Sequence, residues 1–328
     1  MHWGHCVSDD LITWEELPIA LYPDMPYDNG TNGGCFSGSA IEKDGWLYLF
    51  YTSVDEEGNQ TQSVAFTDDG LTFTKYEGNP IIKENPLGDS KEFRDPKVFK
   101  YQDGYRMVVG AGAHNTGAIL LYKSQDLLNW EYVGPVITDG RFGNIIECPN
   151  LCDVDGRWVL MFSSIKAMPH RVIFAVGEFD GVNFTPEVPD GQPESWPYFT
   201  IETGPDFYAP QVLDAPDGRK INIAWMYNWN RREDKGQLQV GAFTFPREMA
   251  FDKAGRLTML PITEGLHLLK KESVFVVYGD GMLKVRFDNR TVLERPYAHE
   301  PDVLTLEDVG SVELFINGGT ENITVYVC

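Results

Sequence analysis

The sequence predicts an all-β fold, in which a five-bladed β-propeller with an incomplete first blade is followed by a small β-rich module. Three observations lead to this prediction. A short acidic turn that ends in an aromatic residue recurs about every 57 residues, and a glycine-led apolar strand recurs in step with it. The breaks between them carry Gly, Pro, Asn and Asp, and the segments lack helical periodicity.

The acidic turn defines the first repeat series. Its copies read Ser-Asp-Asp-Leu-Ile-Thr-Trp, Thr-Asp-Asp-Gly-Leu-Thr-Phe, Ser-Gln-Asp-Leu-Leu-Asn-Trp and, more weakly, Glu-Phe-Asp-Gly-Val-Asn-Phe, and they end at Trp14, Phe73, Trp130 and Phe184. The second series starts at Gly45, Gly104, Gly156 and Gly218. Two independent series with one period predict a unit of four short strands, which is typical of a propeller blade.

The number of blades follows from the period. The repeats end near Pro261, and 261 residues at about 57 per blade give about 4.6 blades. A propeller closes only on whole blades, so we expect five, with part of the first missing. We place the propeller at residues 1–262 and the β-rich module at residues 263–328, which is short for an independent domain.

The charge of the chain narrows the classes of partner. The 328 residues carry 27 Lys and Arg against 49 Asp and Glu, which gives a net charge of −22. Such a surface repels phosphate backbones and anionic headgroups, so we expect no nucleic-acid and no membrane partner. No uncharged apolar run approaches the length of a transmembrane helix. A homo-oligomer is left open.

The cysteines indicate reduced thiols. There are five, an odd number without paired CxxC spacing: Cys6, Cys35, Cys148, Cys152 and Cys328. A disulfide framework or a zinc site is therefore disfavoured. We expect a cytoplasmic location, with secretion left open.

Candidate catalytic residues come from the inner strands, because the first residues of the innermost strand of each blade face the central funnel. The inner strands start at Phe36-Ser37, Phe93-Arg94-Asp95, Ile146-Glu147-Cys148 and Asp206-Phe207-Tyr208. Residues 36, 94, 147 and 207 are separated by 58, 53 and 60 positions, which matches the blade period. Asp95 and Glu147 are therefore expected to come from adjacent blades and to converge on one axis.

Two converging carboxylates fit glycosidic hydrolysis, in which one acid protonates the leaving oxygen and another carboxylate supports an oxocarbenium-like centre. Each residue alone also has a structural explanation, since Arg94 and Asp95 could form an ion pair and Glu147 could be solvated at the rim. The whole set, spaced in phase, favours function. Tyr208, Trp225 and Trp229 suit sugar faces, although a propeller tryptophan taken singly is more often part of the core.

Several segments resemble glycoside hydrolase family 32, the family of invertases and fructan hydrolases. They are His2-Trp3-Gly4-His5 with the following Ser8-Asp9-Asp10-Leu11, then Phe36-Ser37-Gly38-Ser39-Ala40, Arg94-Asp95-Pro96, Glu147-Cys148-Pro149 and Ala224-Trp225-Met226. The resemblance covers residue 1 to about residue 260. The stretch from Val312 to Gly319 is similar to the end of the C-terminal β-sandwich of that family.

The resemblance implies a retaining hydrolase of β-fructofuranosides, with sucrose or a fructooligosaccharide as its carbohydrate partner and without a metal or organic cofactor. By motif match, Glu147 is the general acid/base, and Asp95 stabilises the transition state through the fructosyl hydroxyls. Arg94 orients the sugar. The residues expected around the −1 pocket are Phe36, Ser37, Cys148, Tyr208 and Trp225.

The sequence departs from the family pattern at the nucleophile. The attacking residue of the family is the Asp of an Asn-Asp-Pro motif on the inner strand of the first blade, and this sequence contains no such tripeptide. We therefore expect an N-terminally truncated form with a shortened sandwich, inactive as it stands.

Two other functions are weighed against this one. A non-catalytic carbohydrate-binding propeller would also lack the nucleophile, but the intact flanks of Asp95 and Glu147 favour the enzyme. A related five-bladed glycosidase acting on arabinosides would not explain the Arg94-Asp95-Pro96 and Glu147-Cys148 motifs.

Overall fold

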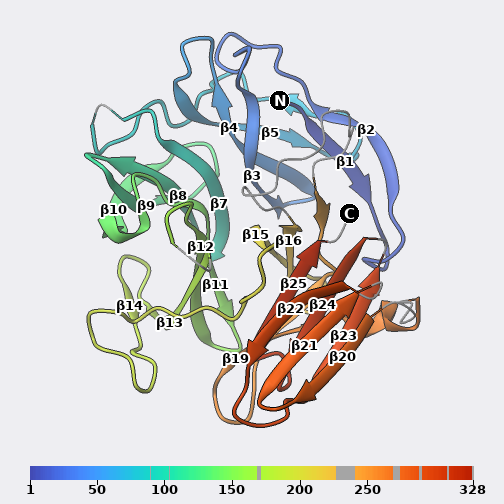
Figure 1. Ribbon diagram of the computed structural model, residues 1–328. Coiled ribbons are helices and arrows are strands. Elements are labelled where there is room, and N and C mark those ends of the chain that lie inside the picture. The colour runs from blue at the N-terminus through green and yellow to red at the C-terminus, as the bar shows by residue number, and fades with distance from the viewer. Residues whose placement is uncertain are drawn as a thin grey trace. The chain divides into compact units, whose positions relative to one another are not determined.

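The computed structural model describes residues 1–88, 90–102, 104–167, 171–226, 241–268, 274–287, 290–308 and 310–326. These residues form β-strands and two 3₁₀ helices, η1 (Gly140–Phe142) and η2 (Thr263–Leu268), so the all-β prediction is confirmed (Figure 1). Neither helix is long and apolar enough to cross a membrane. The chain divides into two compact units, residues 1–168 with 173–198, and residues 169–172 with 199–328.

The first unit contains three four-stranded antiparallel sheets and one hairpin. In each sheet, strands that follow one another in the chain are neighbours. The first sheet is formed by β3 (Gly34–Lys43), β4 (Trp46–Val54), β5 (Gln60–Thr67) and β6 (Thr74–Lys75). The second is formed by β7 (Phe93–Tyr101), β8 (Gly104–Ala113), β9 (Thr116–Ser124) and β10 (Glu131–Asp139). The third is formed by β11 (Glu147–Val154), β12 (Arg157–Ser163), β13 (Val172–Phe179) and β14 (Phe184–Pro186). The hairpin is formed by β1 (Trp3–Val7) and β2 (Glu15–Leu21).

Neighbouring sheets of the first unit share apolar cores, because their middle strands are apolar on both faces. One core joins Phe99 of β7 to Phe162 of β12 and Phe179 of β13. A second joins Phe50 of β4 to Phe93 of β7. Edge-to-face and tilted ring pairs fill these cores, as between Phe99 and Phe179 at a centroid separation of 6.1 Å. The packing fixes the start of each first strand relative to the next sheet.

The repeated acidic residue closes the turn before the outermost strand. Asp69 Oδ1 accepts hydrogen bonds from the backbone N–H groups of Leu71 and Thr72, both at 2.8 Å, and from the Thr67 hydroxyl. The same pair of backbone bonds is accepted by the other copies of the repeat, Asp10, Asp126 and Asp180. The motif that recurs in the sequence is therefore an Asx turn, which a short carboxylate forms with the backbone that follows it.

The second unit contains one sheet of the same kind and two smaller sheets. The first holds β15 (Tyr208–Asp214), β16 (Lys220–Met226), β17 (Ala242–Phe243), β18 (Arg247–Phe251) and β19 (Leu257–Pro261). Its outer turn carries a further Asx residue, Asp252, which sequence analysis missed. The smaller sheets are β20 (Val274–Gly279), β21 (Met282–Phe287) and β22 (Arg290–Pro296), and β23 (Val303–Asp308), β24 (Ser311–Ile316) and β25 (Glu321–Tyr326).

The two smaller sheets share one core, in which Leu283 and Val285 of β21 pack with Val312 and Leu314 of β24. A buried ion cluster joins the β23–β25 sheet to β18. Arg247 is fully buried and pairs with Glu202 at 2.8 Å and with Glu313 of β24 at 2.5 Å. Burial raises the pKa of Glu313, and Arg247 opposes that shift. The β15–β19 sheet and the C-terminal strands therefore share charged groups that have no access to water.

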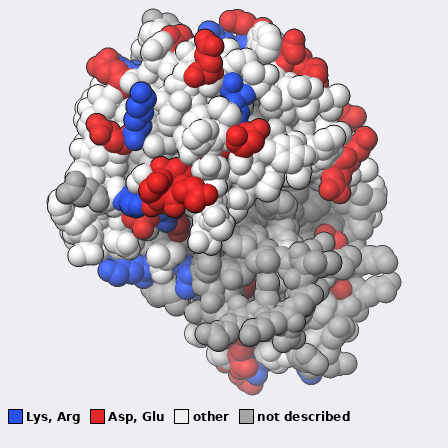
Figure 2. Space-filling model, turned by 90° about the horizontal axis from the view of Figure 1, so that it is seen from above, with Lys and Arg blue, Asp and Glu red and all other residues white. Residues whose placement is uncertain are grey.

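Acidic side chains are spread over the described part of the face in Figure 2, as the net charge of −22 leads one to expect. The described cysteines, Cys6, Cys35, Cys148 and Cys152, are free thiols, as the sequence predicts. Cys328 lies outside the described residues.

Candidate active site

The first strand of each of the four larger sheets contains a bulge at the place where sequence analysis located the candidate residues. The pairing register shifts between Cys35 and Gly38 in β3, Arg94 and Lys97 in β7, Glu147 and Asn150 in β11, and Tyr208 and Gln211 in β15. Extra residues in a bulge turn side chains away from the regular alternation, and bulges are common beside active sites.

Three of the four bulges have the same local structure. A residue with positive φ precedes a proline in each: Asp95 (φ 64°), Cys148 (φ 47°) and Ala209 (φ 49°). Proline lacks the N–H that a ladder needs, so within a sheet it is tolerated at bulges and edges. The left-handed conformation is unfavourable for a residue with a Cβ and is disfavoured again before proline. The surrounding contacts must therefore hold Asp95 and Cys148 in place.

Arg94 and Glu147 form the centre of the candidate site. Arg94 donates from Nη2 to Glu147 Oε1 at 2.8 Å and from Nε to the same oxygen at 3.1 Å. Both side chains are largely withdrawn from solvent, with exposed fractions of 15% and 17%. Because β7 and β11 begin two successive sheets, this ion pair joins the sheets at their inner strands.

Asp95 lies beside this pair and contacts Cys148. Its Oδ2 accepts from the Cys148 backbone N–H at 2.8 Å and from the Cys148 thiol at 3.4 Å. Burial raises the pKa of Asp95 to about 6, against the opposing charge of Arg94, and the nearby Glu147 adds to the increase. Burial also raises the pKa of the Cys148 thiol, and the charge of Asp95 raises it further. Cys148 is therefore a hydrogen-bond donor to Asp95 and not a thiolate nucleophile.

Sequence analysis missed the side chains that hold Arg94 and Asp95. The Arg94 Nη1 donates to Gln60 Oε1 at 3.2 Å and also bonds Glu92. The backbone N–H of Asp95 donates to the Thr52 hydroxyl at 3.0 Å. Thr52 and Gln60 belong to the preceding sheet and are themselves part of no motif recognised in the sequence, so only the packing of the sheets reveals them.

The other predicted residues fall into two groups. Phe36 and Ser37 lie in the bulge of β3, and β3 is joined to β7 by the Ser39 hydroxyl, which donates to the Pro96 carbonyl at 2.8 Å. Tyr208 and Trp225 lie in the second unit, where they are register partners on β15 and β16. Trp229 lies outside the described residues. The structure thus brings Arg94, Asp95, Glu147 and Cys148 together directly, and their chemical roles stay predictions.

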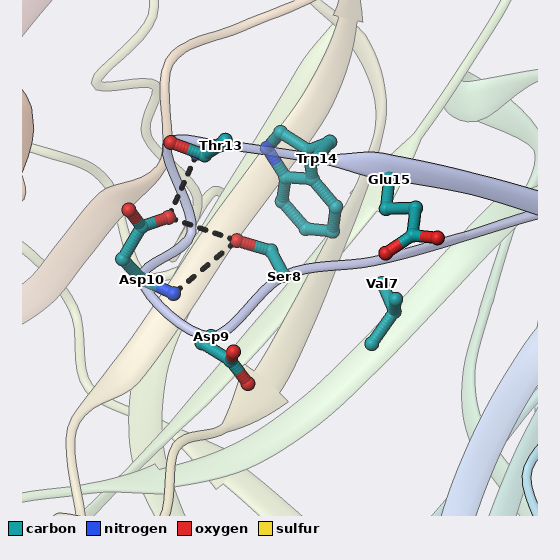
Figure 3. A pocket seen from close by; sticks show the side chains of 7 residues that line it. All are labelled: Val7, Ser8, Asp9, Asp10, Thr13, Trp14 and Glu15. Carbon is teal, nitrogen blue, oxygen red and sulfur yellow. Dashed lines mark hydrogen bonds between the residues drawn. The ribbon is translucent and has the colours of Figure 1, made fainter.

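A separate pocket of about 400 Å³ lies at the turn between β1 and β2 (Figure 3). Its lining comprises Val7, Ser8, Asp9, Asp10, Thr13, Trp14 and Glu15. The Asp10 carboxylate is already hydrogen-bonded within the turn, since its Oδ1 accepts from the N–H groups of Ile12 and Thr13. This pocket belongs to the repeat turn and holds none of the predicted catalytic residues.

Comparison with known proteins gives one consistent result. Residues 1–261 match the glycosyl hydrolases family 32 N-terminal domain. The levanase of Bacillus subtilis is 37% identical over 296 residues, which cover 80% of this chain and 41% of the levanase. The sucrose-6-phosphate hydrolase of Escherichia coli is 33% identical over 387 residues, which cover 97% of this chain and 79% of that protein. Measured on the first three curated relatives, this chain spans about half of their length.

Solved structures agree with this result. The GH32 beta-fructofuranosidase of Bombyx mori superposes with a TM-score of 0.82 at 26% identity and covers 100% of this chain and 80% of its own. Fructan 1-exohydrolase IIa from Cichorium intybus, at 20% identity and a TM-score of 0.80, shares the fold. The matched domain and these relatives show that the chain belongs to glycosyl hydrolases family 32.

Proposed function

We propose that this protein provides the acid/base part of a retaining β-fructofuranosidase site that cleaves sucrose and fructooligosaccharides. The observation that carries the proposal is the meeting of Glu147, Arg94 and Asp95 at the bulges of two successive inner strands. The relatives support the substrate class, since they include a levanase and a raffinose invertase. A variant of the Bombyx mori enzyme was also solved in complex with sucrose.

Each carboxylate has a distinct task in this proposal. Glu147 protonates the leaving oxygen and later activates water, because it is the carboxyl group that remains partly open to solvent. Asp95 accepts hydrogen bonds from fructosyl hydroxyls, since an ionised carboxylate is an acceptor only. Arg94 holds the Glu147 carboxylate through one oxygen. Phe36, Ser37, Cys148, Tyr208 and Trp225 are proposed to surround the sugar.

We further propose a five-bladed propeller with a C-terminal sandwich. In the described residues, an Asx turn directly before an outermost strand occurs five times and supports the blade count, with Asp252 as the fifth after Asp10, Asp69, Asp126 and Asp180. The β1–β2 hairpin has an Asx turn between its two strands, so it corresponds to the two outer strands of the other sheets. The shared core of the β20–β22 and β23–β25 sheets supports the sandwich.

We also propose that residues 1–328 alone do not turn over sucrose. Retention requires a carboxylate that attacks the anomeric carbon, with the two carboxyl groups about 5–5.5 Å apart. Asp95 is bound to the backbone of Cys148, and the sequence contains no Asn-Asp-Pro tripeptide. The attacking group must then come from a further segment.

The test compares two proteins. One is the chain of 328 residues, and the other, called the extended protein, is this chain preceded by the N-terminal strands of a relative that carry the Asn-Asp-Pro motif. Glucose release from sucrose is expected from the extended protein and from neither the chain nor an extended Glu147→Gln variant. Sucrose binding without turnover by both proteins would favour the carbohydrate-binding alternative.

A further inference from the structure

The start of β7 is held by polar side chains from the middle of the preceding sheet. Thr52 lies in β4 and Gln62 lies opposite it in β5. Both are fully buried, among strands whose other inward residues are mostly apolar. Buried polar groups are costly unless they are hydrogen-bonded, so their presence calls for a specific partner.

The side chains of Thr52 and Gln62 form one chain of hydrogen bonds, in which the donor and the acceptor of each bond are fixed. Gln62 Nε2 donates to the Phe93 carbonyl at 2.8 Å. Its amide oxygen accepts from the Thr52 hydroxyl, also at 2.8 Å. With its proton committed to Gln62, the Thr52 oxygen is free to accept, and it accepts from the Asp95 backbone N–H at 3.0 Å. The chain of bonds thus begins and ends on β7, on either side of Arg94.

Asp95 needs such an anchor because its backbone is strained. It has a φ of 64° and precedes Pro96. In this conformation the Asp95 carboxylate accepts from the Cys148 N–H at 2.8 Å. A residue in an unfavourable conformation persists only when its surroundings hold it there.

We infer that Thr52 is a positioning residue for Asp95, acting through the Asp95 backbone N–H and itself oriented by Gln62. Thr52 fixes the bulge that aims the Asp95 carboxylate, and it does so from a different sheet. The assignment of Asp95 to the reaction rests on the proposed function, whereas the positioning of its carboxylate does not.

The first test needs no activity and uses the chain of 328 residues. Asp95 is titrated through its ¹³C carboxyl resonance, and the Cys148 amide resonance reports the bond between the two. In Thr52→Val we expect the Asp95 pKa to fall by about one unit or more towards its ordinary value, because the carboxyl group is no longer held in its buried position. Thr52→Ser keeps the hydroxyl and is expected to titrate as the unaltered chain does.

Ser53→Ala is the matched control. Ser53 is the next residue of β4 and is also fully buried, but its hydroxyl bonds Thr61 and Ser63 of the neighbouring strand. Ser53→Ala removes a buried hydroxyl that makes none of the described bonds to β7. A general loss of packing would therefore affect Ser53→Ala and Thr52→Val alike. An Asp95 titration that is the same in Thr52→Val as in the unaltered chain would overturn the inference.

The second test uses the extended protein. We expect Thr52→Val to lower kcat on sucrose by roughly 10²-fold with little change in KM, and Thr52→Ser to restore most of it. If Thr52→Val fails to fold, Gln62→Met is measured in its place, because it removes the acceptor of the Thr52 hydroxyl proton. An unchanged kcat and an unchanged Asp95 titration in Gln62→Met would refute the positioning role of Thr52. An inactive extended protein would refute the proposed function, while the titration would still decide the role of Thr52.

Discussion

The backbone N–H of Cys148 donates to the carboxylate of Asp95 at 2.8 Å, so two left-handed residues on successive inner strands share one hydrogen bond. Each residue precedes a proline, and each is the turning point of a bulge. The carboxylate of one sheet is thereby oriented by the backbone of the next.

Glu147→Ala in the extended protein is expected to lower sucrose turnover by about 10²–10⁴-fold, which is the usual contribution of general acid catalysis. A β-fructoside with a good leaving group should lose less, because its leaving oxygen needs no proton. The ratio of kcat/KM values for the two substrates is the measurement. Equal losses on both would remove Glu147 from the acid role.

Asp95→Asn in the extended protein is expected to lower kcat and leave KM nearly unchanged. The reason is that hydrogen bonds to the fructosyl hydroxyls gain strength as charge develops in the transition state. Steady-state kinetics on sucrose provide the check. A large rise in KM with kcat preserved would make Asp95 a residue of ground-state binding instead.

The same variant is expected to stabilise the fold at neutral pH. Burial raises the pKa of Asp95 to about 6 in the folded chain, above its ordinary value of 3.8. The folded state therefore binds the proton more tightly than the unfolded state, and stability declines as the pH rises between these values. Asp95→Asn removes this decline and should add about 1–3 kcal/mol at pH 7. Urea unfolding at pH 4 and pH 7 of the 328-residue chain, with and without the substitution, measures this gain in the free energy of unfolding. An Asp95→Asn chain that is no more stable at pH 7 would contradict a buried charge on Asp95.

The Asx turns are expected to weaken in acid. Backbone hydrogen bonds from Thr72 and Leu71 lower the pKa of Asp69 from 3.8 to about 2. A lowered pKa contributes stability above the unfolded value, and that contribution is lost as the pH falls from about 4 through about 2. Asp69→Asn keeps an acceptor oxygen without the charge, so its urea midpoint should fall less steeply over this range. The control is Asp68→Asn, because Asp68 is adjacent to Asp69 and takes part in none of the hydrogen bonds described for the turn.

Arg247→Met is expected to destabilise the chain by about 3–5 kcal/mol, because it leaves Glu202 and Glu313 buried without their partner. Urea unfolding again provides the measurement. Arg256→Met, which removes an ion pair on the surface, should have little effect. Equal effects of the two substitutions would mean that the buried cluster carries no special cost.

The sequence allowed the positions of Asp95 and Glu147 to be predicted because both follow the period of the blades. The bulges themselves were not predicted, although Pro96 and Pro149 are a sequence signal for them, because proline within a sheet is confined to bulges and edges. The fifth Asx turn was not recognised because the residue four positions after Asp252 is Arg256, where the other copies have an aromatic residue.

The supporting residues could not be predicted from the sequence in the same way. Thr52 and Gln62 face each other across two strands and contact a third strand, β7, from the next sheet. Threonine and glutamine in such strands are ordinary residues, and nothing in their spacing indicates which backbone groups they meet. Their role depends on how the two sheets pack, which no local pattern encodes.

The Arg247 cluster has a consequence for where the chain can be cut. The family match ends at residue 261, yet Arg247 shares its buried charge with Glu313 and Thr324 beyond that point. A fragment that stops at residue 261 would keep the guanidinium and lose these two acceptors. In native conditions, a protease that removes the C-terminal strands should therefore also make the β15–β19 sheet susceptible to cleavage. The end of the family match is therefore not a position at which the buried charge cluster is complete.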